Sequence, residues 1–312
     1  LTDPAFDVLG APAVSAASNT IFYAANAPAP EERHVFRVDG DGANRMRLTQ
    51  APGHHQGFPS PDGKHLAVLH SDDTTPPELY VTDAAGGVRR RLTHSPQRAF
   101  REIDWAAARY VTFPSLVDDY ALRARILAPR ELEPGRRYPV LFGPVYSNTA
   151  RNRWGGVYGL VQQLLVQKGY VVVQVDVRGS GYGRAFREAF LADFAGGDIE
   201  DLASAAAWLE TQPWADTQRM GLWGSSYGGT LTVYTLLTKP GLFCAGVAAA
   251  AAVDPHFFGT DDVAIVRRPD THPEIFRHAA RRYAANLEDH LLLMHGMQDH
   301  VVPFKTTVAL AE

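Results

Sequence analysis

Short apolar runs alternate with polar turns through the first hundred residues. The runs that match one another are residues 21–25, 35–39, 66–70 and 79–83. Arg-Leu-Thr steps follow, and their leucines, Leu48 and Leu92, lie 44 positions apart. A period of about 40 to 50 residues built from short β-rich runs is typical of propeller blades. We therefore predict that residues 1–109 form the C-terminal part of a β-propeller, about two blades, with a small β-meander as the alternative.

The pattern changes near Arg109, where strands begin to alternate with helical runs. Residues 170–177 are largely β-branched and apolar on both faces, which suits a strand of a parallel sheet covered by helices on each side. A helix is expected around residues 202–209, where apolar positions recur at helical spacing, with Asp198 as its cap. This alternation predicts a doubly wound α/β domain over residues 110–312, incomplete at its C-terminus.

One stretch combines a glycine-rich turn with the flanking elements that a catalytic turn requires. Residues 221–230 read GLWGSSYGGT, with an apolar strand before the turn and a helical run after it. This layout is the nucleophile elbow of α/β-hydrolases, in which a serine occupies a tight strand-to-helix turn. The small neighbours Gly224 and Gly228 let the chain pass that closely. Ser226 is therefore the expected nucleophile, and an ordinary glycine-rich turn is the alternative.

The last predicted strand supplies a candidate for the catalytic acid. Residues 291–296 form an apolar run, and Asp299 follows it, 73 positions after Ser226. Catalytic groups of open α/β sheets gather at the carboxyl ends of the strands. In α/β-hydrolases the triad follows the order serine, acid, histidine. Asp299 therefore fits the acid, and a simple turn aspartate is the alternative.

The catalytic base has no good candidate in the sequence. The one histidine after Asp299 is its neighbour His300, whose side chain would diverge from the carboxylate. The histidines that precede the acid would break the chain order of the fold. They are His256, His272, His278, His290 and His295. We therefore expect the catalytic histidine beyond Glu312, which agrees with the truncated look of both ends of the chain.

Two tyrosines are candidates for the oxyanion hole, which needs two donors directed at the developing negative charge. One donor should be the backbone N–H of Tyr227, the residue after the nucleophile. The second would come from the loop after the strand at residues 140–142, where the hydroxyl of Tyr146 can reach the site. Packing of Tyr146 against that loop is an equal alternative.

Composition narrows the partners of the chain. The 312 residues carry a formal net charge of −4, which suggests neither nucleic acid nor a membrane surface as partner. No apolar run approaches the roughly 20 residues of a bilayer-spanning helix. A peptide is the expected substrate, no cofactor is expected, and a homo-oligomer remains open. The single cysteine, Cys244, is expected to be buried, and neither the cytoplasm nor the periplasm is favoured.

Two further clusters resemble sites but are expected to be structural. Residues 178–183 follow a strand and contain three glycines, but they lack the spacing of a phosphate-binding loop. Four histidines gather in the repeat region without the spacing of metal ligands, so packed or solvated side chains are expected and no metal site is predicted. They are His54, His55, His65 and His70.

Four motifs in one order resemble the prolyl oligopeptidase family of serine peptidases. They read QVDVRGSGYGRAFREAF, GDIEDLASAAAWLETQPW, GLWGSSYGGT and LLLMHGMQDHVVPF, behind propeller-type repeats with a PDGK turn. The dipeptidyl peptidase IV and acylaminoacyl peptidase branches are the most similar. The resemblance implies a peptidase acting on short peptides, with a propeller that screens access. It also implies Ser226 as nucleophile, Asp299 as acid, Tyr227 as oxyanion donor, and a histidine about thirty residues after the acid.

The chain departs from the dipeptidyl peptidase IV pattern around the substrate. Relatives place a tyrosine just before a Gly-Pro step, where this chain has Leu141 and Phe142, so Tyr146 is its expected substitute. Their substrate-binding asparagine two residues after the acid corresponds here to Val301. With Val302 and Phe258, this residue is predicted to line the substrate pocket. The paired glutamates of the dipeptidyl enzymes fall outside this sequence, so exopeptidase and endopeptidase activity both stay open.

Three functions fit these residues. A serine peptidase is the first, and an esterase or amidase is the second, because an elbow and an acid do not choose between an ester and a peptide. The propeller repeats favour the peptidase. The third is a catalytically inactive fragment, because a nucleophile without its base loses several orders of magnitude in rate.

Overall fold

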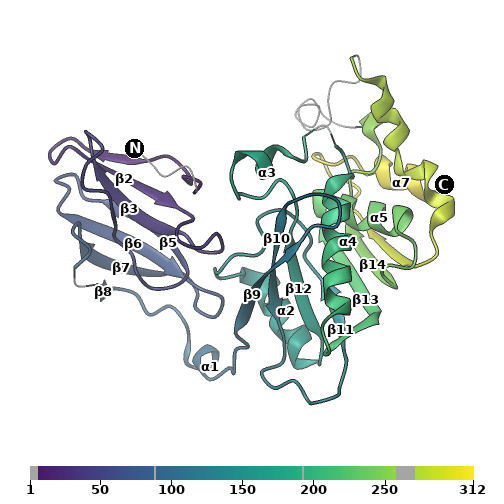
Figure 1. Ribbon diagram of the computed structural model, residues 1–312, viewed down its shortest axis with the longest axis horizontal. Helices are drawn as coiled ribbons and strands as arrows, with labels where there is room; N and C mark the ends of the chain where they lie inside the picture. Colours follow the sequence, from purple (N-terminus) through teal and green to yellow (C-terminus); the bar gives the residue numbers. More distant parts are fainter. Residues whose placement is uncertain (1–5, 88, 192, 258–270) are drawn as a thin grey trace. The chain divides into compact units, whose positions relative to one another are not determined.

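The computed structural model describes residues 6–87, 89–191, 193–257 and 271–312 (Figure 1). The chain forms two compact units. The first unit comprises Leu1–Ala108, Arg151–Gln163 and Gly181–Gly183. The second unit comprises Arg109–Ala150, Leu164–Ser180 and Arg184–Glu312.

The first unit contains two four-stranded antiparallel sheets. The first sheet consists of β1 (Ala13–Ser15), β2 (Thr20–Ala25), β3 (His34–Asp39) and β4 (Met46–Arg47), in that order. The second consists of β5 (His54–Pro59), β6 (His65–Ser71), β7 (Glu78–Asp83) and β8 (Arg90–Arg91). The predicted repeat therefore falls on equivalent strands, β2 with β6 and β3 with β7. Each sheet is a four-stranded meander, as a propeller blade requires.

One apolar cluster joins the two sheets of the first unit. Phe22 and Val35 of the first sheet are buried together with Leu66 and Val68 of the second. Their alternation along the strands sends one side chain in two to this interface, as the twofold period of a strand demands. A small helix, α1 (Arg98–Arg101), follows the second sheet.

The second unit is built on one seven-stranded sheet with the order β15-β14-β13-β11-β12-β10-β9. Its strands are β9 (Ala108–Pro114), β10 (Ala121–Leu127), β11 (Tyr138–Phe142), β12 (Val171–Asp176), β13 (Ala215–Ser225), β14 (Ala245–Ala249) and β15 (His290–Met294). The five strands from β15 to β12 pair in parallel, and β10 pairs antiparallel with β12. Every residue of β12 is buried, as expected for an inner strand with both faces covered.

The helices of this part of the chain lie between the parallel strands or after the last one along the sequence. They are α2 (Gly156–Gln167), which begins in the first unit, α3 (Arg184–Glu188), α4 (Gly197–Glu210), α5 (Tyr227–Thr238) and α7 (Lys305–Ala311). Short 3₁₀ turns occupy Pro255–Phe257, Pro273–His278, Ala280–Arg282 and Ala284–Asn286. Both α4 and α5 pack on β13, and they also contact each other (Figure 1).

Two local predictions were wrong. Asp198 does not cap α4: the helix begins at Gly197, whose N–H donates to the carboxylate of Asp193 at 2.7 Å, and Asp198 lies fully buried in the first turn. Cys244 is exposed, because it precedes β14 at the amino edge of the sheet, where it donates to the Met220 carbonyl.

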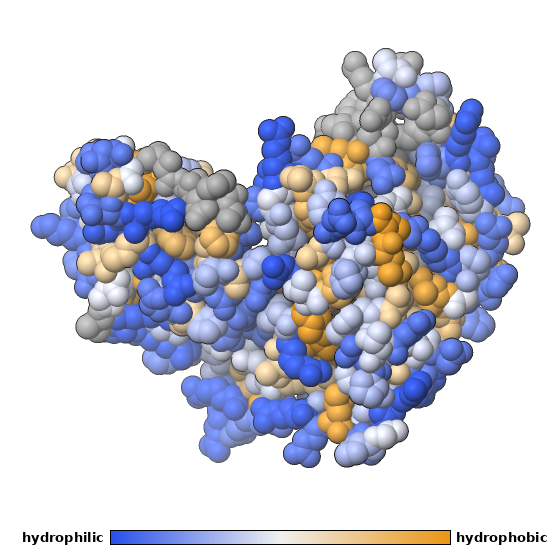
Figure 2. Space-filling model, in the orientation of Figure 1, coloured by the Kyte–Doolittle hydropathy of each residue, from blue (hydrophilic) through white to orange (hydrophobic). Residues whose placement is uncertain are grey.

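In the part of the chain that the structure describes, no helix is long and apolar enough to cross a bilayer. Figure 2 shows polar side chains over most of the face in view, with apolar side chains in small separate groups between them.

Candidate active site

Ser226 occupies a sharp turn between β13 and α5. Its backbone has φ 57° and ψ −127°, a combination that non-glycine residues rarely adopt. Two hydrogen bonds hold this geometry: the Ser226 N–H donates to the Ala249 carbonyl at 2.9 Å, and the Ser226 carbonyl accepts from the Thr230 N–H at 3.0 Å. The residue is exposed. A strained, exposed serine at a strand-to-helix turn has the geometry of a nucleophile elbow.

The glycines around Ser226 are required by close backbone contacts. A Cβ at Gly224 would lie 2.5 Å from the backbone of Gly228, and a Cβ at Gly228 would lie 2.0 Å from the carbonyl oxygen of Val145. Real Cβ atoms do not approach other atoms so closely. The turn is therefore packed so tightly against β14 and the loop after β11 that only glycine fits at these positions.

Asp299 lies after β15 in a turn that favours its ionised form. The N–H groups of Val301 and Val302 both donate to one carboxylate oxygen at 2.9 Å. These bonds, first that of Val302 and then that of Val301, lower the pKa of Asp299. The other oxygen lies 3.6 Å from Nε2 of His295. At neutral pH this side chain is a carboxylate, which is the form that orients a catalytic histidine.

Strand register brings Ser226 and the residues before Asp299 to one edge of the sheet. Ser225, the last residue of β13, is aligned with Ala249 of β14, and Ala249 is aligned with Met294 at the end of β15. The Ala250 N–H also donates to the Met294 carbonyl at 2.8 Å. The strands are parallel, so their carboxyl ends meet at this edge, as catalytic residues of α/β sheets require.

The histidines near this edge are either engaged elsewhere or placed away from it. His295 is fully buried, and its ring nitrogens bond to Thr307 at 2.7 Å and to the Val302 carbonyl at 2.8 Å. His300 is exposed. His290 begins β15 and therefore lies at the opposite edge of the sheet. His256 lies on the loop after β14, where Nδ1 is 2.6 Å from Asp254 and the ring stacks on Phe276.

The two predicted oxyanion residues are neighbours in the structure. Tyr227 is the first residue of α5, so its N–H belongs to the first turn, whose amides have no partner within the helix. The ring of Tyr146 packs edge-on against the ring of Tyr227 with 6.3 Å between the centroids. The loop that carries Tyr146 is fixed to β13, because the Val145 N–H donates to the Trp223 carbonyl at 2.9 Å.

Two family models match separate parts of the sequence. The model of the prolyl oligopeptidase family matches residues 157–312, and that of the dipeptidyl peptidase IV N-terminal region matches residues 1–96. The chain belongs to the prolyl oligopeptidase family. The predictions of this family, and of propeller blades followed by an α/β-hydrolase sheet, are therefore confirmed.

Related proteins in the prolyl oligopeptidase family include fungal and bacterial examples. "Probable dipeptidyl-aminopeptidase B" of Aspergillus oryzae is 27% identical over all of this chain, and that of Aspergillus terreus is 29% identical. The crystal structure of Porphyromonas gingivalis dipeptidyl peptidase 4 superposes with a TM-score of 0.89 at 27% identity, over 99% of this chain and 44% of that one. The chain spans about a third of the length of the curated relatives, 36% for the A. oryzae protein.

The residues predicted to line the substrate pocket of this family member have different environments. Val301 is 83% exposed, whereas Val302, whose N–H donates to Asp299, is buried. Phe258 lies outside the described residues. These three assignments remain predictions.

Sequence reasoning missed the role of Asp198 beside the elbow. Its carboxylate is fully buried and accepts a hydrogen bond from the hydroxyl of Tyr227. Burial, the main cause, together with the negative charge of Asp201, raises the pKa of Asp198 to about 7. The helical spacing of Asp198 and Asp201 is visible in the sequence, but nothing in it shows that both carboxylates are buried.

The basic loop after β12 is structural at its start. Arg178 makes a bidentate ion pair with Asp201 and a further ion pair with Asp118 at 3.0 Å. Ser180 is fully buried and donates to the Val177 carbonyl. Because Asp201 and Asp118 occupy the guanidinium of Arg178, this side chain has no free pair of N–H groups with which to bind a phosphate.

The histidines of the first unit form a packed stack. His55 lies between His34 and His70, with ring centroids 5.0 and 4.4 Å apart. Burial lowers the pKa of His55 to about 2 and that of His54 to about 4. Within the described ranges no group of three histidine, cysteine or acidic side chains is arranged to hold a metal ion.

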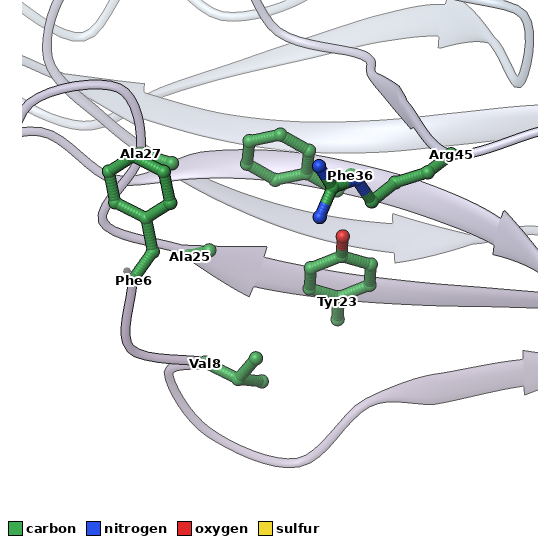
Figure 3. Close-up of a pocket in the computed structure, with 7 residues that line it drawn as sticks. All are labelled: Phe6, Val8, Tyr23, Ala25, Ala27, Phe36 and Arg45. Carbon is green, nitrogen blue, oxygen red and sulfur yellow. The ribbon is translucent and has the colours of Figure 1, made fainter. Parts of the chain in front are cut away.

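A small apolar pocket opens on the first sheet of the first unit (Figure 3). The rings of Tyr23 and Phe36 stack with 5.4 Å between centroids, and the guanidinium of Arg45 lies beside them. Phe6 and Val8 complete the wall. The residues that line this pocket include none of the predicted catalytic residues.

Proposed function

We propose that this chain is part of a serine peptidase that cleaves short peptides through an acyl-enzyme. Ser226 would attack the scissile carbonyl, and Asp299 would orient the histidine that takes the serine proton. The N–H of Tyr227 and the hydroxyl of Tyr146 would stabilise the oxyanion. The positive φ of Ser226 carries this proposal, since a rare backbone conformation at an exposed serine needs a reason beyond folding.

We further propose that the base is a histidine following residue 312. Three observations support this: the chain order of the fold, the two bonds that engage His295, and the exposure of His300. A fourth is the edge strand β15, where Leu292 and Met294 are 55% and 54% exposed. An apolar face on an edge strand is usually covered by further structure. The 312 residues alone would then be inactive.

The same proposal assigns a different role to each part of the chain. Residues 1–109 would be the last blades, about two, of a propeller that limits access, and residues 110–312 most of the catalytic domain. Phe258, Val301 and Val302 would line the pocket for the substrate side chain. The names of the relatives favour release of dipeptides from a free amino terminus.

Hydrolysis assays on two proteins test this function. The first is the 312-residue chain, and the second is the same chain extended through the codons that follow Glu312. The extended protein should cleave Gly-Pro or Ala anilides, and Ser226→Ala should abolish this activity. The 312-residue chain should neither cleave anilides nor react quickly with a fluorophosphonate. Rapid labelling of Ser226 in the shorter chain would contradict the proposed base.

The same assay separates the peptidase from an esterase. Cleavage of short acyl esters without any cleavage of anilides would favour the esterase and overturn the peptidase. A reading frame without a histidine in the forty or so codons after Glu312 would instead favour an inactive protein.

A further inference from the structure

The side chain of Tyr227 is held in a polar socket next to the elbow. Its hydroxyl donates to the Asp198 carboxylate, and the backbone of Ala195 also interacts with this hydroxyl. The ring of Phe194 packs against it with 6.2 Å between centroids. We call Phe194, Ala195 and Asp198 the Tyr227 socket. Phe194 and Ala195 precede α4 and Asp198 lies in its first turn, whereas Tyr227 starts α5.

Burial of the Asp198 side chain in the socket is energetically unfavourable. Asp198 is completely buried, and Arg178, which lies on the loop after β12, is paired with Asp201 and Asp118. The charges that act on Asp198, those of Asp201 and Asp193, are both negative. A buried carboxyl group without a cation is unfavourable unless its hydrogen bonds compensate.

The backbone of the socket is also strained. Ala195 has φ 51°, a region that alanine rarely adopts. The backbone of Ala195 interacts with the Tyr227 hydroxyl, where it opposes the rise in the Tyr227 pKa that burial causes. The buried carboxyl group of Asp198 and the strained backbone of Ala195 therefore both interact with the hydroxyl of Tyr227.

Tyr227 carries two functions on one residue. Its backbone N–H is the expected oxyanion donor, and its side chain is anchored at the far end of the ring by the socket. An anchored ring restricts rotation about the bonds of Tyr227 and so limits the direction of its N–H. A donor that is misplaced by about 1 Å loses much of its effect on the transition state.

We propose that Asp198 is a positioning residue that fixes the Tyr227 N–H in the oxyanion hole through the Tyr227 hydroxyl. The inference rests on the proposed function, because it assigns a role within that site. It predicts that loss of the Asp198–Tyr227 bond weakens binding of the tetrahedral transition state and leaves binding of the ground state unchanged.

Steady-state kinetics of the extended protein test this prediction. Asp198→Ala and Tyr227→Phe should each lower kcat about tenfold with little change in KM, a fraction of what loss of a whole oxyanion donor costs. Asp198→Asn, whose amide oxygen still accepts from the hydroxyl, should keep kcat within about threefold of the parent. The double variant Asp198→Ala/Tyr227→Phe should be no slower than the single variants, because both remove the same bond.

Inhibitors distinguish positioning from general destabilisation. A dipeptide boronic acid, which forms a tetrahedral adduct with the serine, should bind Asp198→Ala about tenfold more weakly. A product peptide should bind the variant and the parent equally. Tyr234→Phe is the matched control, since Tyr234 lies in the same helix and its buried hydroxyl donates to the Val253 carbonyl at 3.1 Å. This control should lower stability without changing kcat or boronate affinity.

The possible outcomes are distinct. If Tyr227→Phe keeps the parental kcat, or if the effects of the two single variants multiply, the inference is overturned. Tyr227→Phe alone decides the matter if Asp198→Ala does not fold. If the extended parent and its Ser226→Ala variant are equally inactive on anilides, the proposed function itself fails and the inference falls with it.

Discussion

The two units differ in the residues that they place at positive φ. Among the described residues of the first unit, the non-glycine cases are Asn19 and Asn44, whose side chains tolerate this region in tight turns. In the second unit the described cases are Asn148 together with Ser226, Ala195 and Ala250, so serine and alanine occur at positive φ in this unit. Serine and alanine gain nothing locally from such a backbone, so the surrounding structure must hold it.

The strained residues of the second unit gather around the elbow. Ser226 follows β13 and Ala250 follows β14, and each donates its N–H to the carbonyl at the end of the neighbouring strand. The backbone of Ala195 interacts with the hydroxyl of Tyr227. Among the described residues, serine and alanine at positive φ occur in the second unit and not in the two sheets of the first. The comparison indicates that the backbone at the carboxyl edge of the parallel sheet carries strain that folding does not require.

Ser226→Gly is the substitution that tests this contrast most strongly. In the extended protein it should lower anilide hydrolysis at least about 1,000-fold, because the nucleophile is lost. It should also stabilise the second unit by about 1 kcal/mol, because glycine accepts φ 57° without strain. Urea unfolding measures the second effect. Asn44→Gly, the control in the first unit, should change stability by less than about 0.5 kcal/mol. A destabilised Ser226→Gly would show that the elbow is not strained.

Gly228→Ala tests the packing of the elbow. The added Cβ would lie 2.0 Å from the Val145 carbonyl oxygen, so we expect a loss of about 3 kcal/mol in stability. The displaced elbow should also lower kcat about 100-fold in the extended protein. Gly159→Ala is the matched control, because nothing lies within 4 Å of its Cβ and it sits inside helix α2. That control should be neutral or stabilising by up to about 1 kcal/mol. Equal stability of both variants would refute the close contact.

The elbow and the sheet edge were predictable from sequence because their signals are local. The glycines beside Ser226 and the apolar run before Asp299 lie within a few residues of the groups that they position. Repeated runs likewise predicted the blade strands. The alternation of strands and helices likewise predicted a largely parallel sheet, since parallel strands must be joined by crossovers, but it did not predict the order of the strands.

The remaining features depend on contacts between distant parts of the chain. Asp198 and Tyr227 are 29 positions apart, and the sequence around Asp198 favours an ordinary helix cap. His34, His55 and His70 come from three strands, β3, β5 and β6, and stack only when those strands pack. Burial changes the pKa of such groups, and burial is a property of the fold rather than of a motif.

Buried ionisable groups give the two units opposite responses to pH. In the first unit, burial lowers the pKa of His55 to about 2, so the folded state binds fewer protons than the unfolded state. Stability of this unit should therefore fall as the pH drops below about 6.5, by up to about 1.4 kcal/mol per pH unit for each such histidine. Hydrogen exchange of β5 and β6, corrected for intrinsic rates, measures this slope between pH 7 and 5.

Two variants test whether His55 causes the loss of stability of the first unit at low pH. His55→Phe keeps a ring in the stack but removes the proton, so the slope should become shallower. His65→Phe changes an exposed histidine at the start of β6 and should leave the slope as it is. An unchanged slope in His55→Phe would contradict the prediction.

The second unit should respond in the opposite direction because of Asp198. Its folded pKa of about 7 lies above that of an ordinary aspartate, so the folded state holds a proton that the unfolded state releases. This contribution is complete below about pH 4 and is lost as the pH rises through 7, with a slope of up to about 1.4 kcal/mol per pH unit. Asp198→Asn should remove it, whereas Glu210→Gln, at the exposed end of the same helix, should not. Hydrogen exchange of β13 and α5 provides the measurement. Identical slopes in Asp198→Asn and the parent would show that Asp198 does not cause this pH dependence.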